Sequence, residues 1–368
     1  MSVRASRPAG HAGRPAHAGS PAGGGGQPAP EGFGGWPAPD AAGGRPALDA
    51  VGGRAAPDAA GEWRAPFVLD LPQTLGVHQR GRGDPAFRIT GDGAIWRTAL
   101  TPAGPGTLRV AAAQLTTVPA VPGPATLVRA ASWGPGASWL LGTLPALLGS
   151  GDDRAGFDPA HPVLREMSAR YQGVRVGRSG LVFEALVPAV LGQKVVGVEA
   201  RRAWRFLLLR FGAPAPGPAP PGMRVFPPPR VWRRIPSWDW HRAGVEGVRA
   251  RTIIGAAEVA GRLDEIVTMA PAAADRRLRS LPGIGPWTSA ETRQRACGDA
   301  DAVSVGDYHL PAAVGWALAG RVVDDAGMLE LLAPYAGHRH RAARLVELGG
   351  LGPPRRGPRM SVRDYRAF

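Results

Sequence analysis

The sequence predicts an α+β protein, with a mostly α-helical core preceded by a small antiparallel β-sheet domain and a disordered N-terminal tail. Three observations predict this order. Residues 1–64 contain 15 Gly, 16 Ala and 9 Pro. Short β-type runs separated by glycine and proline then continue to about residue 157. From 158 to 350 the apolar residues recur at helical spacing, and a basic tail occupies 351–368.

The N-terminal segment, residues 1–64, has too few large apolar side chains to offset the conformational entropy lost on folding. We therefore expect it to be disordered. A start site assigned too far upstream would explain the same composition. Nothing in this segment carries chemistry.

The β-sheet domain, residues 65–157, is predicted from five runs rich in β-forming residues, at 67–71, 86–89, 94–100, 107–110 and 126–129. Glycine and proline clusters at 91–93 and 102–106 separate them as turns. Alternation over 94–100 and 107–117 is typical of an antiparallel sheet with one solvated face. A predicted helix at 138–148 covers the other face.

The helical domain, residues 158–350, is predicted from apolar residues that repeat with the period of an α-helix. Residues 213–222 contain five prolines and are expected to form a loop. The expected helices lie at about 161–171, 180–193, 195–211, 228–235, 245–261, 263–269, 273–280, 287–297, 307–319, 325–334 and 338–348.

The charge balance favours a polyanionic partner, because the chain has a formal net charge of +15 and a pI near 11.4. Residues 1–64 hold six Arg against five acids, so about +14 of this charge belongs to 65–368. However, the chain has 43 Arg, one Lys and no Asn, which indicates a nucleotide-composition bias. Arginine richness alone is therefore weak evidence for nucleic-acid binding.

The cysteine count and the hydropathy pattern predict a soluble cytoplasmic protein. Cys297 is the only cysteine, so the chain can form neither an internal disulfide nor a four-cysteine iron–sulfur cluster. No apolar run reaches the roughly 18 residues of a membrane span. No charged-then-apolar signal pattern opens the chain.

The most informative segment is Leu281-Pro-Gly-Ile-Gly-Pro-Trp-Thr288, followed by Asp307, 22 residues after Gly285. Glycines at alternate positions allow positive φ and leave no Cβ between the backbone and a ligand. The N–H groups of such a turn, with the helix that follows, can bind an anion. Taken singly, the turn could be an ordinary helical hairpin, and Asp307 could be an N-cap of an apolar helix that begins there.

Together these residues resemble the helix-hairpin-helix DNA glycosylases, and most of all the bacterial 3-methyladenine type. The resemblance implies that the hairpin residues Gly283, Gly285 and Thr288 bind a DNA phosphate. A monovalent cation held by turn carbonyls could assist; no other metal or cofactor is expected. It also implies that Asp307 is the catalytic residue.

A second segment, Ala189-Val-Leu-Gly-Gln-Lys-Val-Val196, resembles the element that these glycosylases insert into the minor groove. The resemblance implies that Gln193 and Lys194 contact DNA. A buried glutamine at a helix junction would look the same. Lys194 stands where relatives often carry an apolar or amide wedge, so the wedge residue stays open, since lysine fills a base stack poorly but holds a phosphate well.

The chain lacks the lysine that strand-cleaving relatives place two residues after the last hairpin glycine. Trp287 stands there, and Lys194, the only amine side chain, belongs to the other segment. We therefore expect a monofunctional enzyme, in which Asp307 stabilises positive charge on the deoxyribose. No strong general acid occupies an expected position, which fits an alkylated purine that already carries positive charge.

The flipped base is expected to enter an aromatic pocket, because π faces attract an electron-poor base. Trp287 and Tyr308 are the candidates beside the hairpin and the acid, and Trp238 and Trp240 lie on a predicted loop that could close over them. Core packing is the alternative for each tryptophan. His338 either lines the base pocket or faces phosphate.

These residues predict a monofunctional DNA glycosylase that removes alkylated purines from double-stranded DNA by base flipping. We expect it to act as a monomer, in the first step of base-excision repair. Two alternatives stay open: a non-catalytic helix-hairpin-helix DNA-binding protein, for which Asp307 would have no use, and a glycosylase for another lesion.

Overall fold

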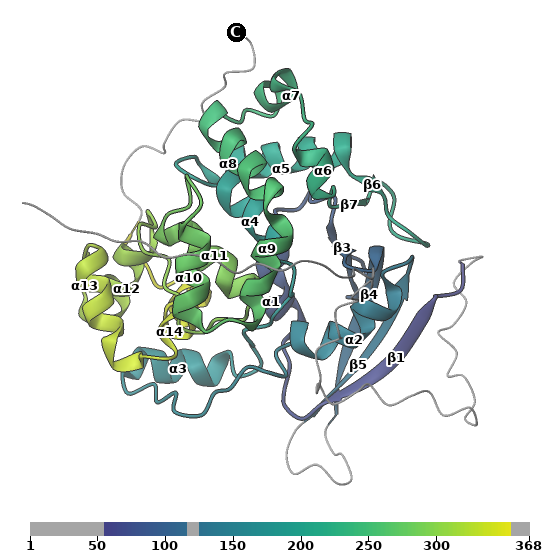
Figure 1. Ribbon diagram of the computed structural model, residues 1–368. Coiled ribbons are helices and arrows are strands. Elements are labelled where there is room, and N and C mark those ends of the chain that lie inside the picture. The colour runs from purple at the N-terminus through teal and green to yellow at the C-terminus, as the bar shows by residue number, and fades with distance from the viewer. Residues whose placement is uncertain (1–54, 116–124, 355–368) are drawn as a thin grey trace, which may run out of the picture. The chain divides into compact units, whose positions relative to one another are not determined.

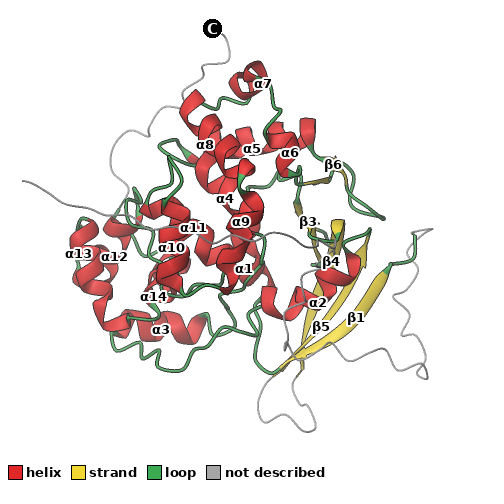
Figure 2. Cartoon of the chain, viewed as in Figure 1, coloured by secondary structure: helices red, strands yellow, loops and turns green. Residues whose placement is uncertain are grey.

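The computed structural model describes residues 55–115 and 125–354, which belong to one compact unit. A small sheet formed by the first part of the chain leads into a run of helices (Figures 1 and 2), which confirms the α+β class. The predicted disorder of residues 1–54 and the basic tail from 355 onward lie outside the described residues.

The sheet has five antiparallel strands in the order β1-β5-β4-β3-β2. Its strands are β1 Ala59–Ala65, β2 Phe87–Ile89, β3 Ile95–Thr101, β4 Gly104–Leu115 and β5 Ala125–Trp133. Helix α2, Ala137–Leu147, packs against β1, β4 and β5. It corresponds to the helix that was predicted at 138–148 to cover one face of the sheet.

Two features of the sheet domain differ from the prediction. The boundary after residue 64 is too late, because β1 pairs with β5 along its whole length and Glu62 bonds Arg129 at 2.6 Å. Residues 67–71 do not form a strand. Instead the Asp70 side chain accepts the N–H of Gln73 and caps helix α1, Leu71–Leu75, with proline in its first turn.

The expectation of one solvated sheet face is wrong for β3, where six of the seven residues are buried. A short hairpin pairs β6 Ala213–Pro214 with β7 Arg224–Val225, so the predicted proline loop at 213–222 begins with β6 and forms most of the connection to β7. Its residue Met223 packs with Trp96 and Trp133, whose rings stack at 5.4 Å. The sequence did not reveal this cover because the hairpin comes from the helical part of the chain.

The helices fall close to the predicted ranges, with one addition. Helix α7, Ser237–Arg242, occupies the segment that was predicted as a loop. The others are α3 Pro162–Arg170, α4 Val182–Leu191, α5 Gly197–Phe211, α6 Pro229–Trp232, α8 Gly247–Glu258, α9 Ala260–Asp264, α10 Pro271–Arg279, α11 Pro286–Ala296, α12 Leu310–Ala319, α13 Asp325–Leu332 and α14 Arg339–Leu348.

Helix α4 is the centre of the larger helical core. Eight of its ten residues are buried, and it packs against α5, α8, α9 and α11. A second core joins α3 with α12, α13 and α14. Since α11 follows the glycine turn and α5 follows the Gln193 segment, this packing places the two predicted DNA-contacting segments side by side.

A buried ion pair joins the sheet to the helical core. Arg97 on β3 donates to Glu184 on α4 at 2.5 Å, and their side chains are 5% and 15% exposed. Burial raises the pKa of Glu184, although Arg97 counteracts this. The pair therefore fixes the sheet against α4. The sheet domain and the helical domain, divided in the prediction after residue 157, are thus in contact through this pair.

Candidate active site

The glycine turn joins α10 to α11, as the sequence predicted. Gly283 has φ +85°, and a Cβ there would overlap the Thr252 hydroxyl. Gly285 differs from the expectation: its φ is −94°, and a Cβ there would meet nothing within 4 Å. Only Gly283 needs glycine for the turn, while Gly285 leaves open space beside the first turn of α11.

Gln193 is bound to this turn. Its Nε2 donates to the Gly283 carbonyl at 2.9 Å and to Thr288 Oγ1 at 2.8 Å. Thr288 is 2% exposed, so it offers almost no surface to a ligand. The part-buried Gln193 amide thus braces the hairpin turn, and a contact of Gln193 with DNA stays a prediction.

Lys194 is exposed at the connection between α4 and α5. Its φ is +54°, in the left-handed region, and it is the one residue other than glycine with a positive φ among those the structure describes. A side chain there costs roughly 1–2 kcal/mol relative to glycine. Such strain at an exposed position points to a function for the side chain.

Asp307 precedes α12 instead of opening it, since the helix begins at Leu310. Its Oδ1 accepts the backbone N–H groups of His309 at 2.8 Å and Leu310 at 2.9 Å, as a capping residue would. Its Oδ2 accepts the indole N–H of Trp287 at 2.9 Å. Capping therefore accounts for one oxygen only, and the other is turned to the helix after the hairpin.

The four aromatic candidates have different surroundings. Trp287 is part-buried beside Asp307 and Gly192, whereas Tyr308 is 84% exposed. Trp238 and Trp240, which were expected on a loop, lie on the helix α7. Trp240 is 4% exposed within the core, whereas Trp238 is 61% exposed. Core packing is thus the explanation for Trp240.

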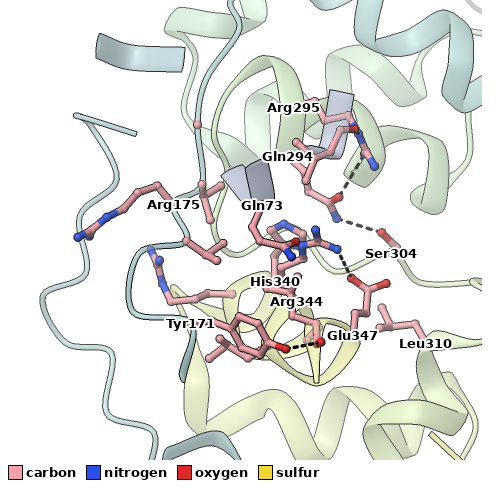
Figure 3. Close-up of a pocket in the computed structure, with 18 of the residues that line it drawn as sticks. Gln73, Tyr171, Arg175, Gln294, Arg295, Ser304, Leu310, His340, Arg344 and Glu347 are labelled. Carbon is pink, nitrogen blue, oxygen red and sulfur yellow. Dashed lines mark hydrogen bonds and ion pairs between the residues drawn. The ribbon is translucent and has the colours of Figure 1, made fainter. Parts of the chain in front are cut away.

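A cavity of about 190 Å³ opens beside Asp307 (Figure 3). One water molecule needs roughly 10–15 Å³ of such a cavity, so the cavity has room for a much larger group, of nucleobase size. Segments far apart in the sequence line it: Gln73 on α1, which lies between β1 and β2 in the chain, Tyr171 and Arg175 after α3, and the helices α11 and α14. Its other polar side chains include Glu291, Gln294, Arg295, Ser304, His340, Arg344 and Glu347.

The lining differs from the predicted aromatic pocket, because Tyr171 is its one aromatic side chain among the described residues. Neither Trp287 nor Tyr308 lines it. His338 does not line it either: its Nε2 lies 3.0 Å from the Ala155 carbonyl, and its ring packs on Phe157. His340, two residues later, faces the cavity instead.

Hydrogen bonds fix most polar groups of the cavity (Figure 3). Gln294 donates to Ser304 Oγ at 3.0 Å, and Ser304 donates to Glu291 at 2.7 Å. Glu291 also pairs with Arg295 at 2.9 Å. Across the cavity, Arg344 lies 3.5 Å from Glu347. The walls therefore present paired charges on both α11 and α14.

The electrostatics of the cavity oppose added positive charge at His340. Burial, with Arg295, Arg344 and Arg341 nearby, lowers the pKa of His340 to about 3, so its imidazole is neutral at pH 7. Burial together with Glu291 and Asp307 raises the pKa of Glu347, and Arg344 opposes the rise. The absence of a strong general acid from the expected positions stays a prediction, and Glu347 is a further carboxyl group in the cavity lining.

Most of the lining residues carry little signal in the sequence. Gln73, Glu291, Gln294 and Glu347 have no motif around them, and they converge only because α1, α11 and α14 pack around the cavity. His340 came nearest to prediction, because it lies in the His-Arg-His-Arg stretch at 338–341. There the sequence pointed to the wrong histidine.

Within the described ranges, no helix has the length and apolar character needed to cross a membrane. The same residues contain no group of three or more His, Cys, Asp or Glu side chains arranged to hold a metal ion.

Comparisons by sequence find no relative: no family model and no curated protein matches. By structure, the chain is similar to a 3-methyladenine DNA-glycosylase from Archaeoglobus fulgidus, with TM-score 0.61, 16% identity, and coverage of 79% of this chain and 98% of that one. It is similar to MBOgg1 bound to a low-affinity DNA ligand, with TM-score 0.58, 15% identity and coverage of 81% and 99%.

A third similar structure is the 8-oxoguanine glycosylase/lyase of Clostridium acetobutylicum, with TM-score 0.56, 12% identity and coverage of 80% and 99%. In all three comparisons the match extends over nearly the whole of the other chain. The protein therefore has the fold of the helix-hairpin-helix DNA glycosylases. At these identities the likeness is one of fold.

Proposed function

We propose that the protein is a DNA glycosylase, which hydrolyses the N-glycosidic bond of a damaged nucleotide flipped out of the duplex. The position of Asp307 carries this proposal. Its carboxylate lies at a cavity of nucleobase size and bonds the helix that follows the hairpin turn, in a chain with the glycosylase fold.

The proposed chemistry requires an ionised Asp307. Three N–H donors, from His309, Leu310 and Trp287, hold the carboxyl group of Asp307 in place. As the glycosidic bond breaks, positive charge develops on the deoxyribose, and a fixed carboxylate stabilises it and can orient a water. The base leaves into the cavity.

The proposed DNA contact is the turn together with the adjoining α4–α5 connection. The N–H groups of Gly283 and Gly285 and the first turn of α11 bind a phosphate, and Lys194 binds another part of the backbone. A monovalent cation on turn carbonyls belongs to the same proposal. Gln193 already occupies the Gly283 carbonyl, which leaves fewer carbonyls for such an ion.

The proposed enzyme is monofunctional. Trp287 stands at the lysine position of strand-cleaving glycosylases, and its indole is bonded to Asp307. Lys194, the sole lysine, belongs to the α4–α5 connection. After the N-glycosidic bond is cleaved, both DNA strands should stay intact until alkali cuts the abasic site. Borohydride should trap no adduct between enzyme and DNA. A trapped adduct that disappears in Lys194→Ala would contradict this.

Alkylated purines of the 3-methyladenine type are the first proposed substrates. Asp307, Glu291 and Glu347 bring three carboxyl groups to the cavity, and these attract a base that already carries positive charge. Such a base leaves readily, so little acid catalysis is needed.

One observation favours a second substrate class, an uncharged oxidised or deaminated purine. The arginines that help to keep His340 neutral also oppose a cationic base beside it. Gln73 and the neutral His340 can both donate and accept hydrogen bonds at a base edge. Glu347, with its raised pKa, is then a candidate proton donor for the leaving base.

A lesion panel tests the function and separates these classes. Duplexes containing methylated purines, 8-oxoguanine, hypoxanthine or uracil are incubated with the protein, and the released base is measured by mass spectrometry. Release from any lesion supports a glycosylase, and its identity decides the class. Tight duplex binding with no release from any of them would favour the non-catalytic alternative.

The first prediction concerns Asp307→Asn, which removes the charge at nearly constant shape. Base release should fall by at least about 100-fold, while duplex affinity holds or rises because one anion near phosphate is lost. Asp324→Asn is the matched control, because Asp324 caps α13 through the Gly327 N–H and lies outside the cavity lining. Near-normal base release by Asp307→Asn would leave Asp307 as a cap only.

A further inference from the structure

The Trp287 ring lies between the two DNA-contacting segments and the acid. Trp287 is the second residue of α11, directly after the glycine turn. The far edge of its ring approaches Gly192, where a Cβ would be 3.3 Å from the ring. Its other side carries the N–H that meets Asp307 Oδ2 at 2.9 Å. The packing at Gly192 therefore limits how far the indole can turn away from the acid.

The two oxygens of Asp307 are held by different elements. Oδ1 accepts the backbone N–H groups of His309 and Leu310 at the start of α12. Those bonds fix one oxygen but leave the carboxylate plane free to tilt about the Cβ–Cγ bond, which is a soft torsion. The donor on Oδ2 comes from α11, so the two sets of bonds together define the plane.

We propose that Trp287 is the positioning residue for Asp307: its indole N–H fixes the carboxylate plane toward the cavity. This inference rests on the proposed function, in which Asp307 is the reacting carboxylate. It also gives the residue at the lysine position a task in a monofunctional enzyme. A carboxylate held in place before reaction needs no reorganisation as charge develops.

Trp287→Phe tests the proposal, because it keeps an aromatic ring and removes the donor. The single-turnover rate of base release should fall about tenfold, as expected for one hydrogen bond to a charged group. The dissociation constant for undamaged duplex should not change.

A second measurement needs no substrate. The Asp307 carboxyl carbon is labelled with ¹³C, and its NMR chemical shift should differ between Trp287→Phe and the parent, because one hydrogen bond to the carboxyl group is lost. Trp238→Phe is the matched control, since it removes an indole N–H at an exposed site on α7. It should leave the rate, the affinity and the carboxyl chemical shift unchanged.

If phenylalanine disturbs the packing against Gly192, a benzothienyl-alanine at 287 replaces the N–H with sulfur at nearly the same shape. An unchanged rate and an unchanged Asp307 carboxyl chemical shift in either variant would overturn the positioning role. Equal losses of rate and of undamaged-duplex affinity would overturn it too, since they indicate a damaged hairpin. If Asp307→Asn also retains activity, the proposed function fails, and that result is distinct from both.

Discussion

The two glycines of the hairpin turn differ in what a side chain would meet. Gly285→Ala adds a methyl group in open space at an ordinary φ, so unfolding stability should change by less than about 0.5 kcal/mol. In the proposed DNA contact, the same methyl group lies where a phosphate would approach the first turn of α11. Affinity should therefore fall for damaged and undamaged duplex alike, as measured by fluorescence anisotropy.

Gly283→Ala is the contrasting variant. It combines a positive φ with overlap on Thr252, and should lower unfolding stability by roughly 1–2 kcal/mol or more in urea titrations. An affinity loss in Gly285→Ala confined to lesion-bearing DNA would place Gly285 at the base pocket. Unchanged affinity for both duplexes would make the segment an ordinary turn.

At the scale of elements, the α4–α5 connection combines Gln193, which is bonded to the hairpin turn, with Lys194, whose backbone is strained. Lys194→Gly removes the left-handed strain and should raise stability by up to about 1 kcal/mol, less the entropy glycine adds to the unfolded chain. Loss of one cation should weaken duplex binding and reduce the salt slope by about 0.9. Thermal unfolding and binding titrations at several salt concentrations measure the two effects.

Lys194→Arg serves as the control for charge, because it keeps the cation and the strained backbone. It should match the parent in both stability and salt slope. A glycine variant that gains stability and also keeps full affinity would show that the strain has no part in DNA binding.

At the scale of the whole molecule, the cavity makes stability depend on pH. The pKa of His340 is about 3 in the folded protein against 6.5 for the free side chain, because burial and the surrounding arginines oppose the charge. The unfolded chain therefore takes up this proton first as the pH falls. The stability associated with neutral His340 is complete above about pH 6.5 and is lost as the pH falls toward 3.

His340→Gln should remove this contribution. Relative to pH 8, the variant should lose less stability than the parent on acidification, with a difference that grows by up to about 1.4 kcal/mol per pH unit. Urea titrations at pH 8, 6, 5 and 4 measure it. His78, whose pKa burial also lowers, should retain its own acid sensitivity in the variant. Parallel curves for both proteins would show that His340 does not titrate in this window.

The sequence by itself determined the features that depend on local chemistry. Glycine and proline place the turn before α11, apolar periodicity sets most helix ranges, and alternation places β3 and β4. The resemblance carried by the turn and by its spacing from Asp307 pointed to the carboxylate that the structure holds beside α11. These signals work because a few adjacent residues carry each of them.

Only the tertiary structure decided which side chains meet. It turned one Asp307 oxygen to Trp287, bonded Gln193 to the hairpin, and selected His340 instead of His338 for the cavity. It also covered β3 with a hairpin from the helical region. Such contacts join residues far apart in the chain, and the packing of α4, α11 and α14 sets them, so no local pattern records them.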